Sequence, residues 1–282
     1  MSFIQFARAH GVEIDPARLY PGEKIKRCGT VEKPRSRNGA YFWDGQRGWV
    51  FNWQGQAQVQ WYDDPAAKPW TEAEKAAWKA QRQAQRIRQE QGYQRAAQQA
   101  HELLRTATPG THSYLHAKGF PQAEGLIAQD GALLIPMRHH QTNALQGVQM
   151  IRWLEDERRH EKKMQPYGMK AAGAVHRMGS NNTLETCLVE GYATGLSVLE
   201  ALRGMGVQAV VLVCFSAHNL TLVAQGVHGR AYVFADHDKS GTGQSAAEQT
   251  GLPWCMSPIE GEDANDLHQR AGVLAVRQLL MR

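Results

Sequence analysis

The chain contains 282 residues, carries a formal net charge of +5 and is 42% hydrophobic. This length allows one large domain or two modest ones. No apolar run approaches the ~18 residues of a membrane span and no signal peptide is visible, so we expect a cytoplasmic protein without a membrane partner. The net charge fits a protein that binds a polyanion, but ordinary solubilising charge explains it as well.

The cysteines indicate free thiols in a reducing compartment. Cys187 and Cys214 fall in predicted buried strands, and Cys255 lies in a further apolar run. Cys28 has no Cys-x-x-Cys partner, and no histidine spacing completes a set of four ligands, so we do not expect a zinc site.

Residues 1–67 are predicted to form a small antiparallel β module. A short helix and turn occupy residues 1–20, and glycine turns then separate three aromatic strands. These strands are expected at residues 40–43, 48–53 and 58–62, with hairpin turns at Asp44-Gly45 and Gln54-Gly55.

The aromatic residues of the middle strand have two interpretations. Trp49, Phe51 and Trp53 alternate, so their side chains project from one face of the sheet. They could stack on unpaired bases while the lysines and arginines between residues 24 and 47 hold phosphates. Alternatively, the tryptophans form the core of a module too small to have another one.

Residues 68–107 are predicted to be a basic helical linker. The stretch 65–69 (PAAKP) breaks the strand pattern, and Thr71 caps a helix that continues to about Leu104. Cations at helical spacing form a stripe along it, at Lys75, Lys79, Arg82 and Arg86. The stripe fits a nucleic-acid backbone, and a solvated linker helix explains it equally well.

Residues 108–180 are predicted to form a basic α+β subdomain. Residues 133–137 and 147–151 look like paired strands. Several cations follow, and we select Arg152, Lys162, Lys163 and Lys170 as candidate phosphate contacts. The alternative is that these cations belong to a solvated hairpin.

Residues 181–282 contain continuous apolar runs at 186–189, 209–215 and 231–235, which predict strands that are covered on both faces. Helical patterns between them indicate a doubly wound parallel sheet. Glu190 directly follows the first run, and Asp236 and Asp238 follow the third, so we expect all three carboxylates at one edge. Such carboxylates repel one another unless a cation neutralises them, and oxygen ligands suit Mg²⁺ or Mn²⁺.

A second acidic cluster lies at residues 261–267. Asp263 and Asp266 are candidates to hold a second metal ion or to orient its waters, and Asn265 is a candidate nucleotide contact. Alternatively, Asp263 caps a helix that runs on through Leu279.

Three of these segments resemble the Toprim domain, which bacterial-type primases, topoisomerases and some nucleases share. They are residues 189–195 (VEGYATG), 235–241 (ADHDKSG) and 261–267 (GEDANDL). Residues 113–120 (SYLHAKGF) are similar to a segment ahead of the polymerase core in many Toprim primases. More narrowly, the chain resembles the primases of phages and plasmids, with an N-terminal module similar to a zinc ribbon that has lost its ligands.

The resemblance implies an α/β fold, in which a doubly wound parallel-sheet Toprim domain follows the basic α+β subdomain, the helical linker and the small β module. It implies a DNA primase that makes short RNA primers on single-stranded DNA from ribonucleoside triphosphates, with Mg²⁺ or Mn²⁺. Glu190, Asp236 and Asp238 would be catalytic metal ligands. A replicative helicase or other replication or transfer proteins are the expected partners.

Two other functions stay open. A metal-dependent nuclease would use the same carboxylates, and a non-catalytic module of a replication or transfer complex would use only the basic surfaces. The chain is too short for the gate of a topoisomerase. It contains no Gly-x-x-x-x-Gly-Lys-Ser/Thr loop, which argues against a fused ATPase.

Overall fold

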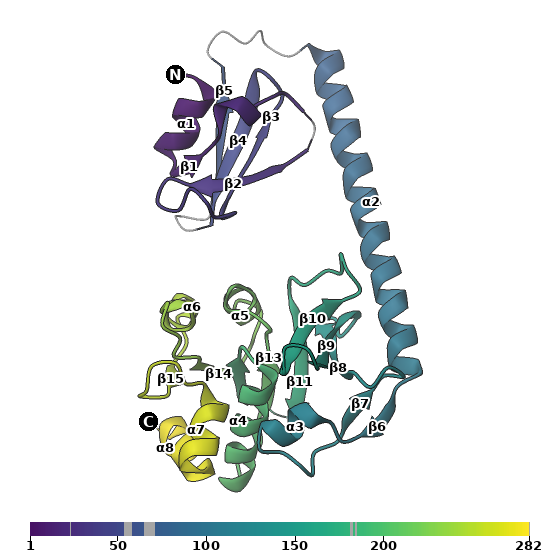
Figure 1. The fold of residues 1–282 in the computed structure, drawn as a ribbon, viewed down its shortest axis with the longest axis vertical. Coiled ribbons are helices and arrows are strands. Elements are labelled where there is room, and N and C mark those ends of the chain that lie inside the picture. The colour runs from purple at the N-terminus through teal and green to yellow at the C-terminus, as the bar shows by residue number, and fades with distance from the viewer. Residues whose placement is uncertain (23, 54–57, 65–70, 181–182, 184, 282) are drawn as a thin grey trace. The chain divides into compact units, whose positions relative to one another are not determined.

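The computed structural model describes residues 1–22, 24–53, 58–64, 71–180, 183 and 185–281 (Figure 1). The chain divides into two compact units, Met1–Arg82 and Gln83–Arg282. The predicted turn at Gln54-Gly55 and the whole stretch 65–69 fall outside the described residues. No helix in the described part of the chain is long and apolar enough to cross a membrane.

The first unit contains an antiparallel sheet in sequential strand order. The predicted meander is confirmed, and two further strands precede it. The strands are β1 (Val12–Glu13), β2 (Lys26–Thr30), β3 (Gly39–Trp43), β4 (Arg47–Asn52) and β5 (Val59–Asp63). Helix α1 (Phe3–Ala9) begins with a capping box in which Ser2 accepts from the amide of Gln5, and a short 3-10 helix, η1 (Pro16–Arg18), precedes β2.

The core of this module lies on the sheet face that α1 covers. Phe3 of α1 packs there with Tyr41, Val50 and Tyr62. Trp49 lies in the same strand as Val50 and therefore points to the other face. The interpretation of Trp49, Phe51 and Trp53 as the module core is thus wrong, because α1 and the residues of the other sheet face form that core.

Helix α2 (Glu72–Arg105) confirms that the predicted linker segment is helical. Thr71 and Glu74 form a capping box, since the Glu74 amide donates to the Thr71 hydroxyl and the Thr71 amide donates to the Glu74 carboxylate. Much of the helix is exposed, and its buried residues, Ala96 and Ala100, lie towards its C-terminal end. That end belongs to the second unit, where Ala100 joins a cluster with Leu134 and Val148.

The second unit is built on one mixed sheet with the strand order β10-β9-β8-β11-β13-β12-β14-β15. Strand β7 also pairs with β8, and β6 pairs with β7. The antiparallel part comprises β6 (Thr108–Gly110), β7 (Gly125–Ile127), β8 (Leu133–His139), β9 (Leu145–Leu154), β10 (Arg159–Gln165) and β11 (Ala174–Gly179). Helix α3 (Ser113–Ala117) lies between β6 and β7. Strand β11 pairs with both β8 and β13, so the sheet continues across the predicted boundary between residues 180 and 181.

The parallel part of the sheet confirms the doubly wound architecture (Figure 1). Its strands are β12 (Glu185–Val189), β13 (Val210–Val213), β14 (Arg230–Ala235) and β15 (Trp254–Met256). One face carries α4 (Tyr192–Gly204), α7 (Ala264–Ala271) and α8 (Val273–Leu280), and the other carries α5 (Ala217–Ala224) and α6 (Thr242–Thr250). Each face has its own apolar cluster, which is why the strands are apolar on both sides.

The C-terminal helix differs from the expectation. A single helix through Leu279 was predicted, but the chain forms α7 and α8 with a break at Gly272. Gly272 has a φ of +79°, which a helix does not accommodate and which favours glycine. The break lets both short helices pack against α4.

Candidate active site

The structure brings three predicted carboxylates to one edge of the parallel sheet. Glu190 follows β12, whereas Asp236 and Asp238 follow β14. Strands β12 and β14 are parallel neighbours in which Val189 lies beside Phe234, so the residues that follow emerge together. The next strand, β13, ends at the same edge, where the amide of Phe215 donates to the carbonyl oxygen of Glu190 at 2.8 Å.

Asp236 has an unusual electrostatic environment. Its carboxylate is partly buried, and its Oδ1 atom has no hydrogen-bond partner among the residues that the structure describes. Desolvation raises the pKa of Asp236 to about 8, with further contributions from Asp263, Glu190 and Asp238. Desolvation also raises the pKa of Glu190, and Asp238 adds to the effect. These carboxyl groups therefore destabilise one another when they are ionised.

Asp238 is held differently, because its oxygens serve the loop that starts α6. It accepts from the amides of Ser240 (2.9 Å), Thr242 (3.2 Å) and Gly243 (2.8 Å), and from the Ser240 hydroxyl. Desolvation alone would raise the pKa of Asp238, but together these hydrogen bonds hold it below its usual value. Asp238 is thus the carboxylate of the cluster that is ionised most easily.

Gly243 fixes the same loop against Asp236. A Cβ atom at Gly243 would lie 2.2 Å from the carbonyl oxygen of Asp236, so only glycine allows this approach. Gly241 has a φ of +69°, and a Cβ atom there would meet no other atom within 4 Å. Glycine at position 241 is therefore favoured by the backbone conformation.

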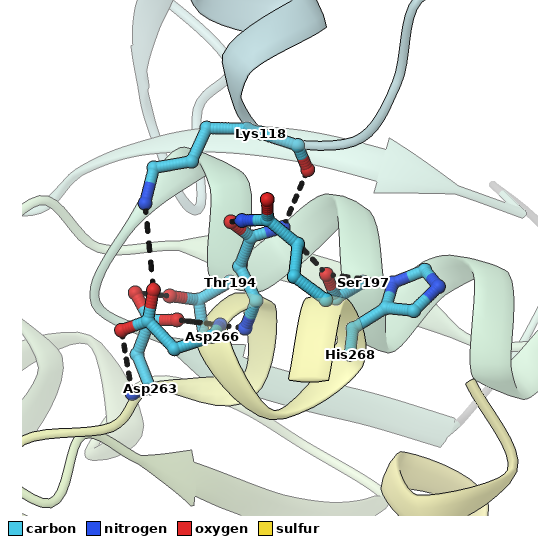
Figure 2. A network of polar contacts seen from close by, with 8 residues as sticks. Lys118, Thr194, Ser197, Asp263, Asp266 and His268 are labelled. Carbon is cyan, nitrogen blue, oxygen red and sulfur yellow. Dashed lines mark hydrogen bonds and ion pairs between the residues drawn. The ribbon is translucent and has the colours of Figure 1, made fainter. Parts of the chain in front are cut away.

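Asp263 and Asp266 form a capping box at the start of α7 (Figure 2). The Asp263 carboxylate accepts from the amides of Asn265 and Asp266, and it also accepts from the Thr194 hydroxyl at 3.1 Å. Asp263 contributes to the raised pKa of Asp236, so it belongs to the same acidic cluster. The capping interpretation is confirmed, and capping leaves Asp263 beside the strand edge.

Asn265 does not lie where a nucleotide contact would need it. Its side chain is fully buried, and it donates to the carbonyl oxygen of Lys118 at 2.8 Å and to the Ser197 hydroxyl at 3.1 Å (Figure 2). The expectation of a nucleotide contact therefore does not fit its position. Asn265 connects α7 to α4 and to the end of α3.

Of two neighbouring lysines on β10, one faces the acidic cluster. The charge of Lys162 opposes the pKa increase of both Glu190 and Asp236, and its Nζ lies 5.2 Å from the centre of the Tyr114 ring. Lys163 points to the other sheet face, where its Nζ pairs with Glu161 at 2.9 Å. Strand alternation therefore separates the two predicted phosphate contacts.

Arg152 and Lys170 also lie away from the carboxylates. Arg152 pairs with Asp130 at 2.6 Å and lines a cavity of about 1030 Å³ together with residues of α2. Lys170 lines a separate hollow of about 320 Å³ with His139 and α2. The structure does not bring either cation to the acidic edge.

Lys118 is a cation of the site that the sequence analysis did not select. Its Nζ lies 3.7 Å from Asp266, and its carbonyl oxygen holds Asn265 (Figure 2). Tyr114, in the same segment, is buried, and this burial raises the pKa of its hydroxyl group to about 12. The similarity of residues 113–120 to a primase segment was the available signal, but it did not indicate which side chains face the carboxylates.

The donor chemistry of the edge fits a hard divalent cation. Glu190, Asp236 and Asp263 offer only oxygen atoms, and the unpartnered Oδ1 of Asp236 would gain a ligand there. The described side chains do not form a complete set, because no three His, Cys, Asp or Glu residues among them are placed to hold one ion. Asp238 is one example, because its carboxylate oxygens accept hydrogen bonds from the loop that starts α6.

The comparisons with known proteins agree with this geometry. A family model described as the Toprim domain matches residues 185–273. The match begins at β12 and ends at the start of α8, so it includes Glu190, Asp236, Asp238 and the capping box of α7. No curated protein matches the chain.

Proposed function

From the premise that this chain carries a Toprim domain at residues 185–273, we propose that it is a DNA primase. The enzyme joins ribonucleoside triphosphates into short RNA primers on a single-stranded DNA template. Toprim domains occur in primases, nucleases and topoisomerases, so the choice among these activities depends on what surrounds the acidic edge.

The observation that supports a primase is the continuous sheet of the second unit. Strands β8 to β11 join the parallel strands through β11, and β10 directs Lys162 towards Glu190 and Asp236. Lys118 adds a second cation beside Asp266. Carboxylates faced by lysines suit the binding of a metal ion together with a nucleoside triphosphate. The carboxylates bind the metal ion, and the lysines neutralise the negative charge of the phosphates.

In this proposal Glu190 and Asp236 hold a divalent cation, with Asp263 beside them. When bound, the cation neutralises phosphate charge and orients the reacting groups. Lys162 holds phosphate oxygens of the incoming nucleotide, and Glu190 accepts the proton of the primer 3′-hydroxyl. The 3′-oxygen forms a bond to the α-phosphorus, and the bond to the pyrophosphate leaving group breaks.

A primer-synthesis assay tests the proposal. Single-stranded DNA, a labelled ribonucleotide mixture and Mg²⁺ or Mn²⁺ should yield short template-dependent RNA with the unaltered protein. Glu190→Gln and Asp236→Asn should each reduce the yield at least 100-fold, which corresponds to about 3 kcal/mol of lost transition-state stabilisation. Glu155→Gln, in the exposed turn after β9, is the matched control and should leave the yield unchanged.

Other outcomes would contradict the primase assignment. Shortened DNA that depends on Asp236 would indicate a nuclease. DNA binding without any RNA product or cleavage would indicate a non-catalytic module. RNA synthesis that survives Asp236→Asn would remove the acidic edge from the reaction.

A further inference from the structure

The sheet of the N-terminal module has two chemically different faces. On one face α1 covers Tyr41, Val50 and Tyr62, which are buried. Phe3 of α1 stacks on Trp43 with ring centres 4.5 Å apart. This face supplies the core, so the opposite face is not needed to stabilise the module.

The opposite face carries a row of aromatic rings. Cross-strand register places Phe42, Trp49 and Trp61 next to one another, with Phe51 beside Val59 in the adjacent row. Trp61 is 64% exposed and Trp53 is 48% exposed. Tryptophan side chains with this much exposed surface on a sheet face indicate a binding surface.

Cations border the same face. The guanidinium group of Arg27 lies 3.7 Å from the ring centre of Trp53. The Nη2 atom of Arg27 donates to the carbonyl oxygen of Arg37 at 2.6 Å, which draws the β2–β3 loop to the aromatic row. Residues 24–37 carry six lysines and arginines and a single carboxylate, Glu32.

The combination of exposed aromatic rings and neighbouring cations indicates which class of ligand this face binds. Exposed rings stack on the flat faces of bases, and neighbouring cations hold the phosphates that connect the bases. The bases of a duplex are already stacked on each other and offer only their edges. A purely apolar protein partner would leave the cations without counter-charges.

We propose that this face, defined by Trp49, Phe51, Trp53 and Trp61 with Arg27, binds single-stranded DNA. Bases stack on Trp53 and Trp61, while Arg27 and the cations of residues 33–37 contact phosphates. The choice of DNA over RNA rests on the proposed function, in which DNA is the template. The surface lies in the first compact unit, whereas the acidic edge lies in the second.

Fluorescence anisotropy with a labelled oligothymidylate tests the proposal in the full chain, with EDTA present and ribonucleotides absent. Trp53→Ala and Trp61→Ala should each weaken binding at least fivefold, as expected when one stacked base is lost. Trp61→Phe should retain most of the affinity, and it keeps the test valid if an alanine variant folds poorly. Trp78→Ala, on α2, is the matched control and should bind normally.

Several results would overturn the proposal. These are unchanged affinity in both Trp53→Ala and Trp61→Ala, competition by duplex DNA as strong as by the single strand, and tighter binding of an RNA of the same sequence. Self-association that Trp61→Ala abolishes without any effect on DNA binding would assign the face to a second copy instead. Because the assay needs no metal ion or RNA synthesis, its failure is distinguishable from failure of the primase assignment.

Discussion

Asp236 shows how a single carboxylate can oppose folding while it serves a site. Burial and the neighbouring carboxylates raise its pKa to about 8, far above the 3.8 of an unperturbed aspartate. Its contribution to stability is therefore complete below pH 3.8 and is lost as the pH rises through about 8. Above that pH the folded protein carries the full cost of a desolvated charge.

Replacing Asp236 with asparagine should stabilise the protein in EDTA. We expect Asp236→Asn to raise Tm at pH 8 by several degrees, since about 1 kcal/mol shifts Tm by roughly 2–4 °C in a domain of this size. The gain should shrink towards pH 4, where the wild-type carboxyl group is protonated. Differential scanning calorimetry at both pH values measures this change in Tm, with Glu155→Gln as the control. A lower Tm for Asp236→Asn at pH 8 would contradict this account of the site.

Lys162 and Lys163 form a second test at the scale of a residue. They are neighbours in sequence, yet only Lys162 acts electrostatically on Glu190 and Asp236, while Lys163 pairs with Glu161. Lys162→Ala should weaken the binding of a ribonucleoside triphosphate and reduce the salt dependence of that affinity, because a cation that contacts the phosphates is lost. Lys163→Ala should change neither quantity. Equal effects of Lys162→Ala and Lys163→Ala would contradict the inference that only Lys162 faces the carboxylates.

At the scale of elements, β11 joins the antiparallel and parallel halves of the sheet, and Asn219 of α5 secures its start. The buried side chain accepts from the amide of Gly173 at 2.7 Å. It donates to the carbonyl oxygens of Ala174 (2.7 Å) and Cys214 (2.8 Å). One amide therefore connects the beginning of β11 to the end of β13.

Asn219→Ala should lower the free energy of unfolding by about 2–4 kcal/mol, because it leaves buried backbone groups without partners. Urea unfolding followed by circular dichroism measures this change. His218→Ala alters an exposed neighbour on the same helix and should stay within about 0.5 kcal/mol of wild type. An equally small change in Asn219→Ala would show that the connection is not needed for stability.

The parallel elements were the part of the fold that the sequence predicted best. Strands such as β13 are buried on both faces, so their sequences are continuous apolar runs that are easily recognised. Long-range packing was harder to predict. Nothing in the local pattern showed that Asn265 would be buried against Lys118, 147 residues earlier in the chain.

The sheet face to which a strand residue points was equally hard to predict from the sequence. The sequence placed Lys162 and Lys163 after two paired strands, but only the pairing of β10 with β9 determines which lysine faces the carboxylates. The aromatic residues of β4 were ambiguous for the same reason. Which face became the core depended on α1, whose packing partner the sequence did not specify.

At the scale of the whole molecule, the chain combines a positive net charge with a concentrated group of carboxylates. The formal net charge is +5, yet Glu190, Asp236, Asp238 and Asp263 meet in one part of the second unit. Within the described residues, the charge of Lys162 and the hydrogen bonds to Asp238 offset part of their mutual repulsion. A divalent cation at this edge would remove the repulsion and connect the acidic site to phosphates that the basic surfaces attract.

Binding of Mn²⁺ to the full chain, followed by electron paramagnetic resonance as the free ion is depleted, tests that claim most directly. The account predicts that the wild-type protein binds Mn²⁺, that Asp236→Asn weakens the affinity at least tenfold, and that Glu155→Gln leaves it unchanged. If Asp236→Asn binds Mn²⁺ as tightly as the wild type, or if the wild type binds none, the acidic edge is not a metal site.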